Sequence, residues 1–386
     1  MKNEKIILRG ITWNHTRGYL PMVATAQRFA ELNPGVEIIW EKRSLQEFAD
    51  APIGGLIEKY DLLVIDHPWA GFGAANNALL PLEKFVPADF LADQKANQVG
   101  PSHDSYTFDG AQTAFAIDAA TPVASWREDL LDAVPPKNWD EVIALARTGK
   151  VLFAGIPIDS LMNFYMMCVA LGEEPFTSRK TVVSRETGRR ALEELRSLAL
   201  LCPPKIFSMN PIAVYEALSR SDEFVYCPFA YGYSNYSRRG YGQKLLAFGN
   251  VPEFNGKPLR STLGGTGLAV SARAAHREMA VNYAQFVASA ETQKTIYTAS
   301  GGQPGHLAAW LDAENNRMTN NYFTRTLPSL DNAWLRPRYN GYLHFQDRAG
   351  DGVRAFLMGE AQADAVLEKM DALYVESLAK NPYETA

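Results

Sequence analysis

The chain has 386 residues, of which 47% are hydrophobic and 21% charged, with a net charge of −5. At roughly 100–200 residues per domain, this length predicts two domains. The composition excludes a disordered or fibrous protein, and no apolar run approaches the roughly 18–20 residues of a membrane span. No block rich in Lys and Arg occurs, so nucleic acid is not expected as a partner.

The three cysteines and the first residues also limit the possible classes. Cys168, Cys202 and Cys227 are far apart and form no C-x-x-C motif, which argues against a disulfide framework or a zinc knuckle. Residues 1–5 lead directly into an apolar segment at 6–13, without the apolar core of a secretory signal. Two interpretations stay open: a mature form that carries a replacement Met, or a protein of the cytosol.

The first hundred residues alternate between strand and helix patterns. A buried strand at 60–65 is apolar on consecutive positions, as a parallel strand covered on both faces requires. This order predicts a doubly wound sheet. Its expected strands are 5–12, 36–40 and 60–65, and its expected helices are 17–32 and 45–59.

Helices dominate the rest of the expected pattern. Asn138 and Glu141 have the layout of a capping box at the start of a helix, and Ser184 is a typical N-cap. An extended segment is expected over 113–121. Further expected strands are 151–153 and 223–227, and further expected helices are 142–147, 161–171, 210–220, 279–288, 343–358 and 361–379.

Four segments carry a resemblance to a known family. They are N-P-G-V-E-I at 33–38, Y-D-L-L-V-I-D at 60–66 with L-L-P-L at 79–82, P-K-N-W-D-E-V at 136–142, and Gln293 followed by S-G-G-Q-P-G at 300–305. In this order the chain resembles a family 1 extracellular solute-binding protein of the sugar-binding type. Such proteins are the ligand-capturing components of ABC importers.

The resemblance implies a two-lobed, periplasmic-binding-protein-like α/β fold. Each lobe would hold a doubly wound sheet flanked by helices and would be discontinuous in sequence. Lobe 1 would comprise residues 1–118 and 269–310, and lobe 2 residues 119–268 and 311–386. Crossings are expected near 118–121 and 262–268, with a third after 305. The ligand would lie in the cleft, and the lobes would close over it.

The resemblance also implies a function without catalysis and without a cofactor or metal. The protein would be a monomer in the periplasm that captures a carbohydrate or an acidic sugar derivative. It would deliver this small solute to an ABC transporter permease in the inner membrane.

Candidate ligand residues follow the expected strands, because ligands of open α/β sheets bind outside the carboxyl ends of the strands. Trp13, His15 and Arg17 follow the first strand, where Arg17 could hold a carboxylate or a pair of hydroxyls in its fork. The alternative is that Trp13 belongs to the core and Arg17 is a solvated residue of the first helical turn.

Asp66, His67 and Trp69 follow the third strand. Asp66 can accept hydroxyl hydrogen bonds and Trp69 can stack on the apolar face of a sugar ring. The alternative for Asp66 is a helix cap.

A cluster of aromatic residues follows the strand at 223–227. Tyr231, Tyr233 and Tyr236 lie close together around Gly232, which favours a loop that presents rings to a ligand over tyrosines packed beneath a loop. Gly265, within the run G-G-T-G at 264–267, could bring backbone close to a ligand, although a hinge is the alternative. This run lacks the G-x-G-x-x-G pattern of dinucleotide binding. Lesser candidates are Trp126, Asp159 and Asn163.

Catalysis has little support, because the chain has no G-x-S-x-G, H-E-x-x-H or P-loop motif. Two rival hypotheses stay open. In a cytosolic sensor or enzyme on the same fold, His15 and Asp66 would form an acid–base pair. In a ferric-ion-binding protein, His15 and His67 would join Tyr231 or Tyr233 around iron. The main geometric expectation is that His15, Asp66 and Tyr231 face one another across a gap.

Overall fold

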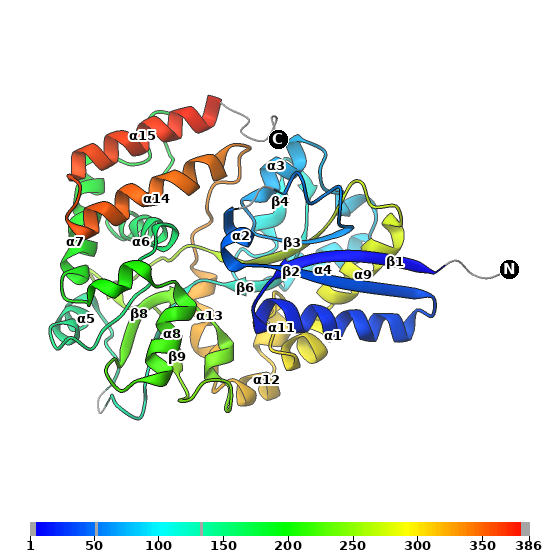
Figure 1. The fold of residues 1–386 in the computed structure, drawn as a ribbon, viewed down its shortest axis with the longest axis horizontal. Coiled ribbons are helices and arrows are strands. Elements are labelled where there is room, and N and C mark those ends of the chain that lie inside the picture. Colours follow the sequence, from blue (N-terminus) through cyan, green and yellow to red (C-terminus); the bar gives the residue numbers. More distant parts are fainter. Residues whose placement is uncertain (1–4, 51–52, 132–133, 380–386) are drawn as a thin grey trace.

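Two lobes lie side by side, each with its own sheet and its own helices (Figure 1). The structure is a computed structural model that describes residues 5–50, 53–131 and 134–379. This arrangement confirms the two-lobed α/β fold that the sequence predicts.

The first lobe is built on a five-stranded sheet with the order β2-β1-β3-β12-β6. β1 is parallel to β2 and β3, as the alternation of strands and helices predicts, whereas β12 is antiparallel to β3 and β6. The glycine run at 264–267 is therefore part of a strand and not a free hinge. The strands are β1 (Ile6–Trp13), β2 (Val36–Arg43), β3 (Leu62–Ile65), β6 (Phe115–Ala120) and β12 (Gly264–Val270).

Helix α1 (Thr16–Leu32) illustrates how the sequence builds this lobe. Its apolar stripe of Met22, Ala26 and Phe29 is buried. The helix ends at Leu32 with Asn33 as its C-cap, and Gly35 adopts a φ of +97° in the turn that follows. The other helices of this lobe are α2 (Leu45–Asp50), α3 (Trp69–Ala75), α4 (Ala88–Ala96), α9 (Arg277–Ala288), α10 (Ala290–Thr292) and α11 (Leu307–Trp310), with short turns η1 (Leu82–Lys84), η2 (Asp104–Tyr106) and η5 (Gln293–Tyr297), and the small hairpin β4 (Thr107–Phe108) and β5 (Ala111–Gln112).

The second lobe departs from the expected doubly wound sheet. Its sheet has the order β8-β7-β9, and both strand pairs are antiparallel. The expected strand at 151–153 contributes only a single parallel bridge from Val151 to Tyr226. The strands are β7 (Pro122–Trp126), β8 (Tyr226–Tyr231) and β9 (Ala247–Gly249), with a separate hairpin of β10 (Glu253–Phe254) and β11 (Lys257–Pro258).

Helices make up most of the second lobe. Asn138, Ser184 and Asn210 cap three of them, since each side-chain oxygen accepts a backbone N–H of the first turn. The helices are α5 (Trp139–Ala146), α6 (Pro157–Ala170), α7 (Arg185–Ala199), α8 (Pro211–Arg220), α12 (Ala313–Met318), α13 (Tyr322–Asp331), α14 (Tyr342–Met358) and α15 (Ala363–Ala379), with turns η3 (Pro204–Ser208) and η4 (Ser234–Ser237).

Two crossings between the sheets run side by side. Thr121 separates β6 of the first sheet from β7 of the second, and its hydroxyl lies 2.7 Å from that of Ser261 on the return crossing. The same hydroxyl donates to the carbonyl of Thr262 at 2.9 Å. Thr121 lies in the first expected segment, whereas the return crossing lies at the edge of the second, since Gly264 already begins β12. The lobe boundaries stay a prediction.

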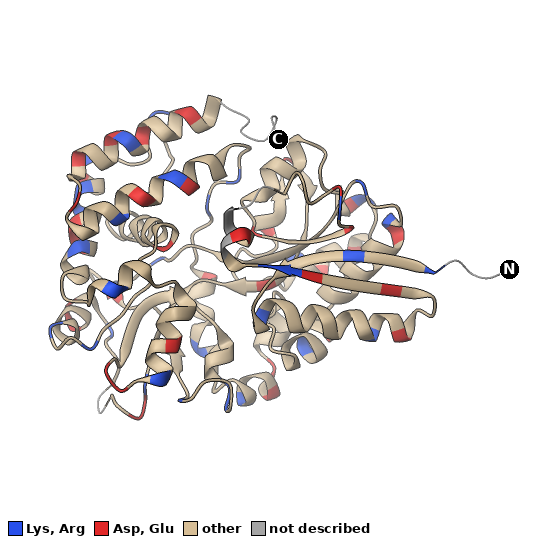
Figure 2. Ribbon diagram, in the orientation of Figure 1, with Lys and Arg blue, Asp and Glu red and all other residues tan. Residues whose placement is uncertain are grey.

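Acidic and basic residues are interspersed over both lobes (Figure 2). Among the residues that the structure describes, no helix combines the length and the apolar character needed to cross a membrane.

Candidate functional site

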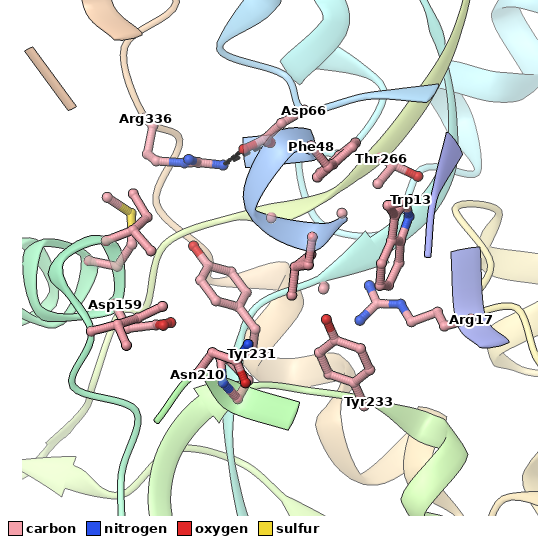
Figure 3. A pocket seen from close by; sticks show the side chains of 18 residues that line it. Trp13, Arg17, Phe48, Asp66, Asp159, Asn210, Tyr231, Tyr233, Thr266 and Arg336 are labelled. Atoms are coloured by element: carbon pink, nitrogen blue, oxygen red, sulfur yellow. Dashed lines mark hydrogen bonds and ion pairs between the residues drawn. The ribbon is translucent and has the colours of Figure 1, made fainter. Parts of the chain in front are cut away.

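A cavity of about 220 Å³ lies between the two sheets (Figure 3). This is below the roughly 300–1000 Å³ of pockets for drug-sized ligands, so it suits a small molecule. The first lobe supplies Trp13, Arg17, Leu45, Phe48, Asp66, Ala120, Gly264, Gly265 and Thr266. The second lobe and its connections supply Ile156, Ile158, Asp159, Met162, Asn210, Pro211, Tyr231, Tyr233 and Arg336.

Arg17 connects the two lobes at one end of the cavity. Its guanidinium forms a bidentate ion pair with Asp118, in which Nε lies 2.7 Å from Oδ2, and Nη1 donates to the carbonyl of Gly232 at 2.7 Å. Burial alone would lower the pKa of Arg17, but the Asp118 carboxylate raises it above its ordinary value. Arg17 is therefore charged, and its charge is neutralised by Asp118 within the protein.

Asp66 and Arg336 form a second pair between the lobes. Nη2 of Arg336 donates to both carboxylate oxygens of Asp66 at 2.8 Å, and Nη1 donates to Gln346 at 2.9 Å. Burial alone would raise the pKa of Asp66, but the charge of Arg336 and then that of His67 lower it by more. The pKa of Asp66 therefore lies well below its ordinary value. Asp66 is ionised and neutralised by Arg336.

Four polar groups of the lining have no partner of this kind among the described residues. The Asp159 carboxylate, the hydroxyls of Tyr233 and Thr266 and the amide nitrogen of Asn210 make no hydrogen bond or ion pair within the described ranges of the chain. In contrast, the Tyr231 hydroxyl lies 2.8 Å from that of Thr262. These free groups lie among apolar and aromatic walls, an arrangement typical of sites for small polar ligands.

The glycines of β12 give the cavity its floor. A Cβ on Gly264 would lie 2.5 Å from the ring of Tyr231, and one on Gly265 would lie 2.3 Å from the carbonyl oxygen of Asp118. Gly265 also has a φ of +102°, which disfavours other residues. These positions need glycine because the strand passes directly beneath Tyr231 and against β6.

The structure brings together six of the predicted site residues. Trp13, Arg17, Asp66, Tyr231, Tyr233 and Gly265 all line the cavity, as does Asp159 from the lesser candidates. Their ligand contacts stay a prediction. Trp13 and Arg17 are also parts of the fold, since the guanidinium of Arg17 lies 4.8 Å from the ring centre of Tyr233 and 5.8 Å from that of Trp13.

His15 does not line the cavity. Its Nδ1 accepts the backbone N–H of Arg17 at 3.0 Å as a helix cap, and its Nε2 lies 3.1 Å from the Tyr241 hydroxyl. Its ring stacks on Trp13 at 5.4 Å. Burial and then the charge of Arg17 lower the pKa of His15 to about 3, so the ring is neutral near pH 7.

The other predicted residues lie in the interior. His67 is fully buried beneath Asp66 and beside Tyr106, and burial above all lowers its pKa to about 4. Trp69 is the first residue of α3 and is fully buried among core side chains. The Tyr236 hydroxyl donates to Glu216 at 2.8 Å, and its ring is buried. Trp126 lines a separate groove, and Asn163 donates to the carbonyl of Ala154 at 3.2 Å.

The geometry gives no support to the two rival hypotheses. His15 and Asp66 have separate partners, Tyr241 and Arg336, and do not form an acid–base pair. His67 packs against Tyr106 rather than the tyrosines of the cavity. Among residues 5–50, 53–131 and 134–379, no group of three His, Cys, Asp or Glu side chains is arranged to hold a metal ion.

Sequence reasoning missed several lining residues. Phe48 lies in an expected helix without a clear apolar pattern, and Thr266 was hidden by the glycines around it. Asn210 could have been chosen from the sequence, since it is a polar residue at the start of the expected helix 210–220. Arg336 carried none, because it lies in an irregular segment between α13 and α14.

Comparisons with known proteins agree with this fold. Residues 24–321 match the family model described as "Bacterial extracellular solute-binding protein". No curated protein is a significant match by sequence. Maltose-bound MalE3 of T. maritima is similar with a TM-score of 0.80 and 18% identity, covering 96% of this chain and 99% of that chain.

Two further solved structures are similar over nearly the whole chain. The maltotriose-binding protein of Thermus thermophilus, bound to maltotriose, has a TM-score of 0.76 and 18% identity over 97% of this chain and 100% of that one. A solute-binding protein of Agrobacterium radiobacter K84, in complex with ribitol, has 0.77 and 18% over 97% and 99%. At these identities the likeness establishes the fold.

Proposed function

We propose, starting from the fact that the chain belongs to the bacterial extracellular solute-binding protein family, that it captures a small carbohydrate between its two lobes. The observation that carries the proposal is the cavity with four uncommitted polar groups among aromatic and apolar walls. The similar solved structures are described with maltose, maltotriose and ribitol, which supports a polyhydroxylated ligand here.

The mechanism combines two kinds of contact. The rings of Tyr231, Tyr233 and Phe48 provide apolar surface for the faces of a sugar ring. The free groups of Tyr233, Thr266 and Asn210 take its hydroxyls. Since Arg17 and Arg336 bridge the lobes beside the cavity, closure of the lobes forms the site and excludes water.

The family is a class of binding proteins rather than enzymes, and it implies a periplasmic or extracellular location. We further propose that the protein is a periplasmic monomer that delivers its ligand to the permease of an ABC importer. A clamp of this kind has to open and close freely to release its cargo.

Calorimetry on the full chain tests the proposal. The panel consists of maltose, maltotriose, tagatose, ribitol and monosaccharides with neutral, basic and acidic substituents. We expect heat from at least one carbohydrate and an increased melting temperature at saturation. Heat from a different class of compound alone, such as amino acids or peptides, would contradict it.

A matched pair of variants locates the binding. Phe48→Ala removes a ring from the cavity wall, and we expect a loss of about tenfold to a hundredfold in affinity, the equivalent of one buried aromatic side chain. Phe85→Ala is the control, because Phe85 is 41% exposed and does not line the cavity. Equal affinities of the two variants would contradict binding at this site.

A further inference from the structure

Asp159 is the one acidic residue of the cavity lining that has no partner among the residues described. It lies in the first turn of α6 and is 6% exposed, and it makes no hydrogen bond or ion pair. Its carboxylate points into the cavity beside Tyr231 and Asn210 (Figure 3). A buried carboxylate without a partner is unfavourable, so a ligand that supplies one gains affinity there.

The cationic groups of the lining are already occupied. Arg17 is bound by Asp118 and by the carbonyl of Gly232, and Arg336 is bound by Asp66 and Gln346. An acidic sugar would therefore meet guanidiniums whose charges Asp118 and Asp66 already neutralise, and it would face the charge of Asp159. The buried Nε of Arg336 is left without a hydrogen-bond partner among the described residues, but its charge is paired. The unpaired charge of the cavity is negative.

An ammonium group matches this environment better than a hydroxyl does. It can donate a hydrogen bond to Asp159 and also neutralise its charge, which makes the bond roughly twice as strong as a neutral one. The ring of Tyr231, which lines the same cavity, also favours a cation, whereas that of Tyr233 already lies against the guanidinium of Arg17.

We propose that the ligand is a basic sugar derivative, an amino sugar whose ammonium group pairs with the Asp159 carboxylate. This inference rests on the proposed carbohydrate-binding function and specifies its substrate class. It changes the expectation of an acidic sugar to that of a basic one.

Matched sugars test the charge preference on the full chain. Calorimetry compares four compounds that share one ring: D-glucosamine, D-glucose, N-acetyl-D-glucosamine and D-glucuronate. The same comparison is repeated with β-1,4-linked disaccharides, where chitosan disaccharide replaces glucosamine. We expect the amine to bind at least about tenfold more tightly than its neutral and acetylated counterparts.

Two variants assign that preference to one side chain. Asp159→Asn keeps the shape of the side chain, and we expect it to abolish the preference, so that the ratio of the affinities for the amine and for the neutral sugar falls to about one. Asp89→Asn is the control, since Asp89 lies in the first turn of another helix, α4, and is exposed. The control variant is expected to keep the preference. A melting curve of each variant verifies that it is folded.

A pH series adds an independent readout. Burial raises the pKa of Asp159 to about 7, so from pH 7 to pH 5 the carboxyl gains a proton and the affinity for the amine falls. The other charged groups of the lining are paired, Asp66 with Arg336 and Arg17 with Asp118. The pKa values of Tyr231 and Tyr233, which lie nearest, are raised by burial, so both keep their protons.

Each outcome has a distinct meaning. Equal or tighter binding of the neutral or acidic sugar overturns the amino-sugar inference but leaves the proposed function intact. A preference for the amine that survives in Asp159→Asn also overturns it. Failure of every sugar in both series, with another class binding instead, overturns the proposed function and the inference together.

Discussion

The two sides of the cavity treat buried charge in opposite ways. On the side of the first sheet, Asp66 and Asp118 each face an arginine that also contacts the other lobe. On the side of α6, Asp159 faces no cation of the described chain. The carboxylates next to the contacts between the lobes are thus neutralised by arginines of the protein, whereas the carboxylate available to a ligand has no cation beside it among the described residues.

The largest effect is expected when a cation is removed from the side of the first sheet, where the aspartates are paired. Arg17→Met leaves Asp118 buried without a partner, and we expect a loss of about 3–5 kcal/mol in the free energy of unfolding. Urea denaturation measures it. Arg28→Met, on the same helix, removes an exposed pair with Glu31, and we expect it to leave the free energy of unfolding almost unchanged, because water screens such a pair. Similar losses for both variants would refute a structural role for the Arg17 pair.

A second test concerns the floor beneath both sides. Gly265→Ala combines a positive φ with a contact of 2.3 Å to the Asp118 carbonyl, and we expect a loss of about 2–4 kcal/mol. Gly35→Ala has a similar φ of +97° but nothing within 4 Å, so it isolates the cost of the backbone angle, about 1 kcal/mol. Thermal unfolding that ranks the two variants equally would show that the close approach has no cost.

The stabilising effect of the Asp66–Arg336 pair should depend on pH. The folded pKa of Asp66 is depressed, so its stabilising effect is present above its unfolded pKa of about 4 and is lost as the pH falls further. We expect Arg336→Met to lose about 2–3 kcal/mol at pH 7, with a smaller difference from the unmodified chain at pH 2.5. Denaturant curves at the two pH values measure this, and a difference independent of pH would contradict the assignment.

For Asp159, which has no partner among the described residues, the pH dependence of stability should have the opposite sign. The folded pKa of Asp159 is raised to about 7, so the ionised carboxylate lowers stability as the pH rises from about 4 to 8. Without ligand, Asp159→Asn should be more stable than the unmodified chain by about 3–4 kcal/mol at pH 8 and close to it at pH 4. A variant that is less stable at pH 8 would mean that Asp159 has a stabilising partner.

The candidate site was partly visible in the sequence because five of its lining residues end or follow strands, among them Trp13 at the end of β1 and Arg17 after it. Asp66 comes directly after β3, and Tyr231 and Tyr233 lie at the end of β8, where the topology of α/β sheets brings polar side chains together. The same reasoning chose His67 and Trp69 as well, because position in the chain does not tell which of several neighbouring side chains turns inward.

Local patterns were enough to predict β1, α1, β2 and β3 of the first lobe and the resemblance to solute-binding proteins, since periodicity and caps are local properties of the chain. The expected helix at 45–59 is shorter, Leu45–Asp50, and the strand β12 was not expected. Which charges meet depends on how segments far apart in the chain pack together. Arg336 lies 270 residues from Asp66, and Arg17 lies 101 residues from Asp118. The packing of α1 against the first sheet forms the Arg17–Asp118 pair, and the contact between the two lobes forms the Asp66–Arg336 pair. Asp159 is left without a partner among the described residues, because the relative position of these surfaces is recorded in no local pattern.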